Sequence, residues 1–256
     1  MHLCRDTEEQ KSRNMNKKDQ LFSKPASSRK RFAFNQAVAE VFDDMIKRSV
    51  PGYEGIIEQI AALAHRVAKP SSRIYDLGSS LGAATMAIRR VLTDESIEIV
   101  AVDKSPAMIE RSKLLLDAYQ SPIKVHLIED DIMNIDISDA SLVIMNFTLQ
   151  FIPLEQRDAL IRKIYDGMSE SSALVISEKI KLPGNKINDL VISLHEDFKR
   201  DRGYSELEIS QKRDALQDVL VPETISEHTT RLDNAGFNQS ALWYQHYNFC
   251  SFLAIK

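Results

Sequence analysis

The sequence predicts an α/β protein built on a doubly wound, mostly parallel β-sheet, and two observations predict this class. A short apolar strand at residues 74–77 breaks at Gly78 and leads directly into a helix. From there, apolar strand-like runs alternate with helical patterns as far as residue 178. Strands that alternate with helices pair in parallel in one sheet. At 256 residues the chain exceeds the ~150 expected for one domain and suits one such domain with insertions.

The first 32 residues differ in charge from the rest of the chain. They hold nine Lys or Arg against four Asp or Glu and show no apolar periodicity, so we expect a basic, disordered tail, although an arm for nucleic acid is the alternative. Residues 33–256 are then expected to form a single domain, with a net charge of −9. Such an acidic body argues against a protein that grips tRNA by itself.

Two helices are predicted before the first strand, at 35–50 and 54–68, and they are placed to cover a ligand crevice. Tyr53 lies between them. It is positioned either to touch a ligand or simply to pack at the helix junction.

The turn after the first strand predicts a nucleoside site. Gly78 and Gly82 bracket a turn that a Cβ would crowd, and the unpaired N–H groups of the following helix can hold a small polar ligand. Asp103 ends the next strand, where an acidic residue accepts hydrogen bonds from ribose hydroxyls. The spacing G-x-x-x-G departs from the dinucleotide fingerprint, so a nicotinamide dehydrogenase is disfavoured.

The remaining elements follow in regular order. Asp131 follows the third strand and can take an adenine amino group, the alternative being a solvated loop acid, while Asn146 ends the fourth strand on the same side. The predicted elements are helix 81–92, strand 97–102, helix 105–119, strand 123–128, strand 141–146, helix 154–168, strand 173–178, and a closing hairpin of strands 240–245 and 248–255.

A helical insert at 185–235, with three helical segments, is predicted to cover the substrate. His195, Glu196 and Asp197 within it face different directions on a helix, so we expect no metal. The two cysteines, Cys4 and Cys250, lack metal-ligand spacing and favour a reducing compartment. With no apolar run near the ~18 residues of a membrane span, we expect a cytoplasmic protein.

Several segments together resemble one known family. The D-L-G-x-x-x-G pattern with its downstream acid resembles motif I of the class I S-adenosylmethionine-dependent methyltransferases. From about residue 32 to the C-terminus, the chain resembles the bacterial carboxy-S-adenosyl-L-methionine synthases in the blocks I-K-R-S-V-P-G-Y (46–53), Y-D-L-G-S-S-L-G-A-A (75–84), S-P-A-M-I-E-R (105–111), N-F-T-L-Q-F (146–151), D-F-K-R (197–200) and G-Y-S-E-L-E-I-S-Q-K-R (203–213).

The resemblance implies a Rossmann-like class I methyltransferase fold with a seven-stranded sheet. It implies a carboxyl transferase of the one-carbon class that converts S-adenosyl-L-methionine (SAM) and prephenate to carboxy-SAM and phenylpyruvate. The product supplies a partner enzyme, a tRNA carboxymethyltransferase, for 5-oxyacetylation of wobble uridine 34. The resemblance also implies a homodimer, with no nucleic acid or membrane bound by this chain itself.

By the family pattern, the cofactor contacts fall on Tyr53, Gly78, Ser79, Ser80, Asp103, Lys104, Asp131, Ile132, Asn146 and Arg213. Three residues depart from that pattern: Ser79 replaces a cysteine, Lys104 an asparagine and Asp130 a glycine. We expect Asp130 to stiffen its loop and cofactor affinity to shift, while the reaction stays the same.

Arg213 is the candidate catalytic residue. A cation near the methyl group opposes an ordinary cationic cofactor, but it stabilises the carboxylate of the product by a charge-assisted pair. Without the family pattern, Arg213 would read as a helix-surface arginine. Arg200 and Lys199 are weaker candidates for the second charge of prephenate. No protein general base is evident, so the hydroxide that leaves prephenate is expected to take the methyl proton.

Two other functions remain open at this stage. One is a conventional SAM-dependent methyltransferase acting on a small acceptor or on tRNA, which has no reason to need Arg213. The other is a non-catalytic SAM-binding scaffold, which would bind the cofactor and turn nothing over.

Overall fold

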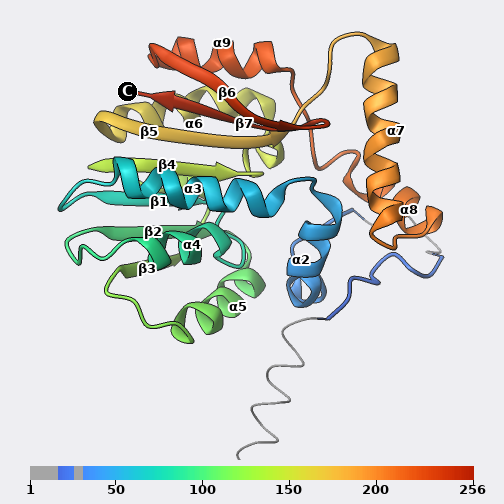
Figure 1. Cartoon of the computed structure of the whole chain (residues 1–256), viewed down its shortest axis with the longest axis horizontal. Helices are drawn as coiled ribbons and strands as arrows, with labels where there is room; N and C mark the ends of the chain where they lie inside the picture. The colour runs from blue at the N-terminus through green and yellow to red at the C-terminus, as the bar shows by residue number, and fades with distance from the viewer. Residues whose placement is uncertain (1–16, 26–30) are drawn as a thin grey trace, which may run out of the picture.

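The computed structural model describes residues 17–25 and 31–256, so the rest of the predicted tail lies outside it. Figure 1 shows one sheet with helices on both faces. The elements are α2 (Gln36–Ser49), α3 (Tyr53–Val67), β1 (Arg73–Leu77), α4 (Ala83–Val91), β2 (Glu98–Asp103), α5 (Pro106–Asp117), β3 (Lys124–Glu129), η1 (Ile132–Asn134), β4 (Ala140–Asn146), η2 (Leu149–Phe151), α6 (Leu154–Gly167), β5 (Met168–Lys179), α7 (Asn185–Asp201), α8 (Glu206–Leu216), α9 (Ile225–Ala235), β6 (Gln239–His246) and β7 (Phe249–Ile255).

The sheet has seven strands in the order β3-β2-β1-β4-β5-β7-β6, which confirms the predicted fold class. Strands β1 to β5 run parallel, and β7 pairs antiparallel with both β5 and β6. The chain leaves β1 toward β2 on one side and returns to β4 on the other. Such a switch opens a crevice at the carboxyl ends of the central strands, where α2, α7 and α8 lie in Figure 1.

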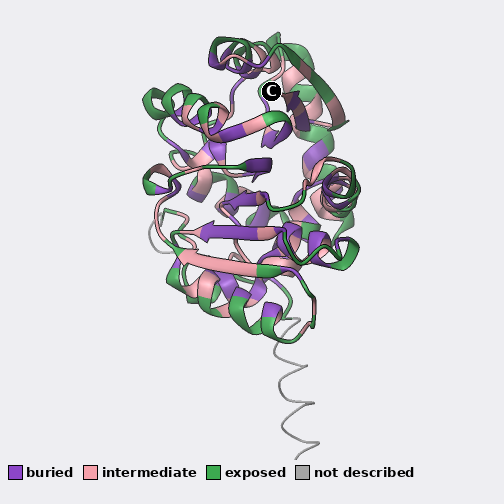
Figure 2. Ribbon diagram, turned by 90° about the vertical axis from the view of Figure 1, so that its left-hand side faces the viewer, coloured by how far each residue is buried: buried purple, intermediate pink, exposed green. Residues whose placement is uncertain are grey.

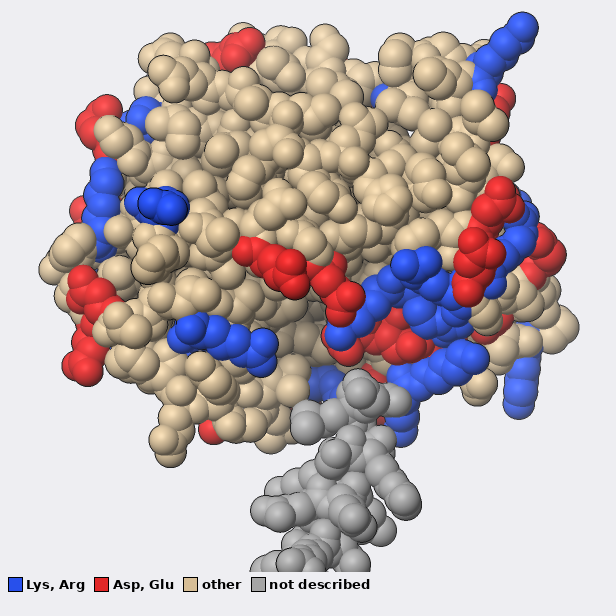
Figure 3. All heavy atoms as spheres, in the orientation of Figure 1, with Lys and Arg blue, Asp and Glu red and all other residues tan. Residues whose placement is uncertain are grey.

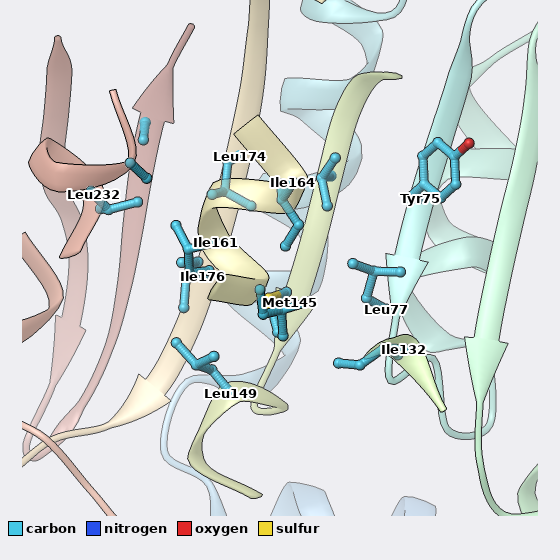
Figure 4. Close-up of a cluster of buried hydrophobic side chains, with 14 of the residues drawn as sticks. Tyr75, Leu77, Ile132, Met145, Leu149, Ile161, Ile164, Leu174, Ile176 and Leu232 are labelled. Carbon is cyan, nitrogen blue, oxygen red and sulfur yellow. The ribbon is translucent and has the colours of Figure 1, made fainter. Parts of the chain in front are cut away.

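The core lies on both faces of the sheet because the central strands carry apolar residues on both sides. Along β4, Val143 and Met145 face one hydrophobic cluster, while Leu142 and Ile144 face the other. Figure 4 shows the first of these clusters, in which Met145 lies beside strand and helix residues. In Figure 2 the inner strands are buried, whereas the edge strand β3 is of intermediate exposure. A sheet covered on both faces holds the strand ends in fixed positions.

The predicted insert divides into two parts. Helix α8 begins with a capping box, in which the Ser205 hydroxyl accepts from the Glu208 N–H and the Glu208 carboxylate accepts from the Ser205 N–H. Together with α7, this helix lies beyond the end of the sheet. Helix α9 instead packs along α6, and its Leu232 and Ala235 belong to the core. The part of 185–235 that covers the crevice is therefore α7, α8 and the segment 217–222 that follows α8, whereas the apolar face of α9 packs in the core.

Residues 17–25, which we call the N-terminal strap, differ from the predicted disordered tail because they lie against the domain. Asp19 is only 1% exposed. Its carboxylate accepts a hydrogen bond from the Tyr204 hydroxyl at 2.5 Å and lies 3.7 Å from the ammonium of Lys212. Arg48 donates to the Asp19 carbonyl at 3.2 Å. A buried carboxylate with these partners ties the strap to α8.

Across the described residues, we find no helix that combines the length and apolar character needed to cross a membrane.

Candidate active site

A cavity of about 1020 Å³ opens at the carboxyl ends of the central strands, between the sheet and the α2, α7 and α8 helices. It collects side chains that lie far apart in the sequence. Its lining includes every predicted cofactor residue, namely Tyr53, Gly78, Ser79, Ser80, Asp103, Lys104, Asp131, Ile132, Asn146 and Arg213, and also Lys199. Of the predicted site residues, Arg200 lies outside this lining.

The turn after β1 depends on Gly78. Its φ of 80° is a left-handed conformation, and a Cβ built on it would lie 2.3 Å from the hydroxyl oxygen of Thr148. The Gly78 and Ser79 N–H groups donate to the Val102 carbonyl at 2.9 and 2.8 Å, which holds the turn against the end of β2. The glycine therefore lets three strand ends approach one another closely.

Asp103 is fixed at the end of β2 by two backbone groups. Its carboxylate accepts hydrogen bonds from the Ser80 N–H at 2.8 Å and the Ser105 N–H at 2.9 Å. Burial raises the pKa of this carboxyl, and the two hydrogen bonds oppose that rise. Each carboxylate oxygen has a further lone pair, so the group can accept hydrogen bonds from the two hydroxyls of a ribose.

Asp131 and Ile132 form the turn that follows β3. The Asp131 carboxylate accepts from the Met133 N–H at 3.0 Å and so begins η1. The neighbouring Asp130 accepts from the Asp131 N–H at 2.7 Å and from the Asn134 amide at 2.8 Å. The carboxylate at position 130 thus fastens its own loop, which agrees with the expectation of a stiffer turn.

Asn146, at the end of β4, carries a polar atom that lacks a partner. Its Oδ1 is buried, and no hydrogen bond to it is found within the described part of the chain. A buried amide oxygen without a partner costs free energy, and a ligand with an N–H group in the cavity would satisfy it. This observation shows that the residues present fit a polar small molecule.

Three aromatic side chains of the cavity lining, Tyr53, Phe147 and Phe249, lie side by side and form what we call the aromatic wall. Tyr53 lies 6.3 Å from Phe147, measured between ring centroids, and Phe147 lies 5.9 Å from Phe249. Burial, with a further contribution from the charge of Asp76, raises the pKa of the Tyr53 phenol well above its usual value. The hydroxyl therefore stays protonated at neutral pH and can donate a hydrogen bond.

Three lysines from three elements also line the cavity: Lys179 at the end of β5, Lys199 on α7 and Lys212 on α8. Burial lowers the pKa of each, to about 8 for Lys199 and Lys212. The charges of Lys179 and Lys212 lower the pKa of Lys199 further, so the ammonium groups repel one another. We call Lys179, Lys199 and Lys212 the lysine cluster.

Sequence reasoning missed two members of this cluster. It named Lys199 but neither Lys179 nor Lys212. A lysine directly after the buried run of β5 was the available signal, since the carboxyl ends of parallel strands face the crevice. Lys212 was recognisable only as the neighbour of Arg213, because its burial depends on the N-terminal strap.

Arg213 reaches the cavity from α8, although its side chain is 59% exposed. Its guanidinium donates to the Glu196 carboxylate at 3.0 Å. Arg200 donates hydrogen bonds to Asp197 and Glu206 on the exposed side of α7 and α8, and its guanidinium lies 3.8 Å from Glu196. A ligand carboxylate at Arg213 must therefore share the guanidinium with Glu196 or displace it.

His195 lies between the lysine cluster and the aromatic wall. Its Nε2 donates to the Ser49 carbonyl at 2.8 Å, so Nδ1 carries no hydrogen. Burial lowers the pKa of the imidazole to about 3, and the charges of Lys199 and Lys179 lower it further. The ring is neutral at physiological pH and is a weak proton acceptor. Among the described residues, no group of three or more His, Cys, Asp or Glu side chains is placed to hold a metal ion.

Two solved structures show the same arrangement of elements. The plantazolicin methyltransferase BpumL, in a complex that includes SAH, matches with a TM-score of 0.61 at 14% identity over 84% of this chain and 89% of its own. Magnesium protoporphyrin IX methyltransferase from Synechocystis, with bound SAH, matches with a TM-score of 0.57 at 13% identity over 83% and 87%. The fold and the glycine turn define a class I SAM-dependent methyltransferase fold.

Curated relatives of known name match nearly the whole chain. The carboxy-S-adenosyl-L-methionine synthase of Photobacterium profundum is 52% identical over 238 residues, which is 93% of this chain and 98% of that protein. The protein of the same name from Escherichia coli K12 is 49% identical over 242 residues, 94% and 98%. The chain therefore belongs to the carboxy-S-adenosyl-L-methionine synthase family and is an enzyme that acts on SAM.

One family model gives a different description for part of the chain. The model described as mitochondrial small ribosomal subunit Rsm22 matches residues 39–204. That segment holds the sheet from β1 to β5 and α7, but it ends before α8 and so leaves out Lys212 and Arg213. The curated relatives also cover α8 and the closing hairpin, and they decide the assignment.

Proposed function

We propose that the protein converts SAM and prephenate to carboxy-SAM and phenylpyruvate. The observation that carries this proposal is one cavity with two chemically different ends. Gly78 and Asp103 provide a nucleoside site, whereas the lysine cluster and Arg213 provide positive charge. Transfer of a methyl group from a cationic sulfonium gains nothing from such charge, but transfer of a carboxylate does.

At the nucleoside end, the residues fit SAM as a substrate. We assign the ribose hydroxyls to Asp103 and the adenine to the turn of Asp131 and Ile132. The unpartnered amide oxygen of Asn146 would accept from the amino group of the methionine part. Tyr53, held protonated, would donate a hydrogen bond at the edge of the same site.

The proposed reaction balances without an added oxidant or reductant. Prephenate breaks the bond to its ring carboxylate and releases carbon dioxide, and the electron pair of that bond expels the ring hydroxide as the ring becomes aromatic. The hydroxide takes a proton from the SAM methyl group and becomes water. The electron pair of the broken C–H bond forms the new bond to carbon dioxide. Because His195 is a weak proton acceptor, the leaving hydroxide is the better base.

We propose that the protein works as a homodimer in the cytoplasm. Ile187, Leu190 and Leu194 form an exposed apolar stripe on α7, with exposed fractions of 53%, 60% and 38%. Such a stripe, opposite the face that carries Lys199, suits an interface between two copies. A buried, free Cys250 is in keeping with a reducing compartment.

We also place the enzyme upstream of tRNA modification, by family resemblance. Its product would supply a tRNA carboxymethyltransferase that acts on wobble uridine 34. In Figure 3 the larger group of Lys and Arg side chains on the face in view is bordered by Asp and Glu, and with the net charge of −9 over residues 33–256 this favours no direct nucleic-acid binding.

Mass spectrometry of purified protein incubated with SAM, with and without prephenate, tests this function. Carboxy-SAM formed only with prephenate, together with phenylpyruvate, is the expected result. SAM that stays unmodified under both conditions would refute the proposal and favour a conventional methyltransferase, for which the SAH-bound structural neighbours offer precedent.

A further inference from the structure

The lysine cluster holds more positive charge than the proposed product needs. The new carboxylate of carboxy-SAM requires one cation, which Arg213 supplies from the cavity wall. Lys212 is engaged elsewhere, since it donates to the Ser49 hydroxyl at 2.8 Å and lies near Asp19. Lys179 and Lys199 remain, and within the described residues neither ammonium has a carboxylate within 4.0 Å.

The fold brings these two lysines to one place. Lys179 is the last residue of β5, and Lys199 shares a face of α7 with Ile192, His195 and Glu196, at the spacing of one helix stripe. All five residues line the cavity. Two half-buried ammonium groups that repel each other have a free-energy cost, and an anion bound between them would remove it.

The chemistry of the substrate decides which anion this is. Prephenate carries two carboxylates, of which one leaves as neutral carbon dioxide and the other stays on the 2-oxo acid side chain. A cation at the departing carboxylate would stabilise the ground state more than the transition state and so slow the reaction. A cation at the retained carboxylate has no such penalty, because this carboxylate keeps its negative charge throughout the reaction.

The part of the aromatic wall formed by Tyr53 and Phe147 suits the departing group. Phe147 lies next to Tyr53, and these two rings offer no cation, whereas Phe249 pairs with Lys179 across β5 and β7. An apolar surrounding favours the change from carboxylate to carbon dioxide, because charge is lost in the transition state.

We propose that Lys179 and Lys199 bind the retained 2-oxo acid carboxylate, and that the departing carboxylate lies against Tyr53 and Phe147 near the SAM methyl group. This inference rests on the proposed function, because prephenate is the substrate only if that function is correct. It also makes phenylpyruvate, which keeps the same carboxylate, a ligand of the same two lysines. The lowered pKa values of both lysines agree with cations whose partner arrives with the substrate.

The test measures the affinity of the full-length protein for phenylpyruvate by calorimetry. Lys179→Met and Lys199→Met should each weaken phenylpyruvate binding at least about tenfold, while SAM affinity stays within about twofold. Lys181→Met is the matched control, since Lys181 is exposed and outside the cavity, and should change neither. The methyl ester of phenylpyruvate, which lacks the charge, should bind the wild type and both variants equally weakly.

Kinetics separate this role from a purely structural one. Lys199→Met should raise the KM for prephenate more than it lowers kcat. Unchanged phenylpyruvate affinity in both lysine variants would overturn the inference, as would a parallel loss of SAM affinity and thermal stability. If wild-type protein binds phenylpyruvate through these lysines but makes no carboxy-SAM, the proposed function fails and the carboxylate site stands.

Discussion

The two ends of the cavity satisfy their polar groups in different ways. At the nucleoside end, Asp103 already accepts hydrogen bonds from Ser80 and Ser105, and the turn at Gly78 is fastened to β2. At the cationic end, the charges of Lys179 and Lys199 repel each other, and in the described chain neither has an acidic partner within 4.0 Å, although Glu196 attracts both from farther away. The nucleoside end is therefore preformed and can bind its ligand without rearrangement. The cationic end instead favours a ligand whose negative charge offsets that of the lysines.

The ends also differ in how the chain assembles them. The nucleoside end comes from consecutive strand ends, β1 to β4, whose positions follow from sheet pairing. The cationic end needs β5, α7 and α8 together, and Lys212 in turn needs the N-terminal strap. The comparison predicts that substitutions at the first end weaken SAM binding, and that substitutions at the second affect prephenate or turnover.

The largest effect is expected for Arg213→Ala. Loss of a charge-assisted donor at the new carboxylate should lower the rate of carboxy-SAM formation about 100-fold or more, with SAM affinity little changed. Quantitative mass spectrometry of the product measures it. Arg200→Ala is the control, because Arg200 also lies near Glu196, at 3.8 Å, but is outside the cavity. Equal losses in the two variants would remove Arg213 from the active site.

Asp103→Asn should act at the other end. The amide keeps the shape but removes the charge and an acceptor, so SAM affinity should fall about 30-fold, within the range of ~1.5–3 kcal/mol for hydrogen bonds to charged groups. Calorimetry with SAM measures the change. Asp94→Asn, an exposed carboxylate away from the cavity, serves as the control. A variant that binds SAM normally would contradict the assignment of the ribose site.

The cationic end should also respond to pH. Lys199 has a pKa of about 8, set by burial first and then by repulsion from Lys179, Lys212 and Arg213, while Glu196 opposes the fall. Because the lysine loses its charge as pH rises through 8, the KM for prephenate should increase about tenfold between pH 7 and pH 9.

The Lys199→Met variant provides the control for this pH dependence, since it has no charge to lose at that position. Its KM should be higher than that of the wild type at pH 7 and should vary less up to pH 9. A profile as steep as that of the wild type would show that another group controls the binding.

The smallest effect is expected for the strap. Asp19→Asn removes the charge opposite Lys212 but keeps an acceptor for Tyr204, so the free energy of unfolding should fall by about 1.5 kcal/mol. Thermal unfolding measures it as a shift of a few degrees. Asp43→Asn, which breaks only a surface pair with Lys47, should change the free energy of unfolding by less than ~0.5 kcal/mol. Equal shifts would mean that the strap is not tied to the domain.

The fold was predictable because its signals are local. The short strand from Ile74 to Leu77, the glycine turn and the acid at position 103 are each signals carried by a few residues, and the seven-stranded order confirms the fold class that they predicted. The placement of α9 was less clear, because a helix with Leu232 on one face has the same pattern whether it covers a ligand or a sheet.

The cationic end was harder to predict because charged residues show no regular spacing in the sequence that would tell a cavity residue from a surface residue. Lys199 and Arg200 are adjacent on α7, and only the packing of that helix against the cavity shows that Lys199 lines it while Arg200 does not. The position of Lys179 at the end of a buried strand was a usable signal for a cavity residue, but sequence reasoning did not name it. The burial of Lys212 depends on Asp19, which lies 193 positions earlier in the chain.

The buried contact of Asp19 also limits how the chain can be shortened. A truncation that starts at residue 33, where the predicted domain begins, would delete the carboxylate that Tyr204 and Lys212 share. It would leave a solvent-accessible gap under α8. Lys212, which lines the substrate pocket, would lose the carboxylate nearest to its ammonium group. A version of this enzyme trimmed for crystallisation or fusion should therefore keep the chain from residue 17 onward.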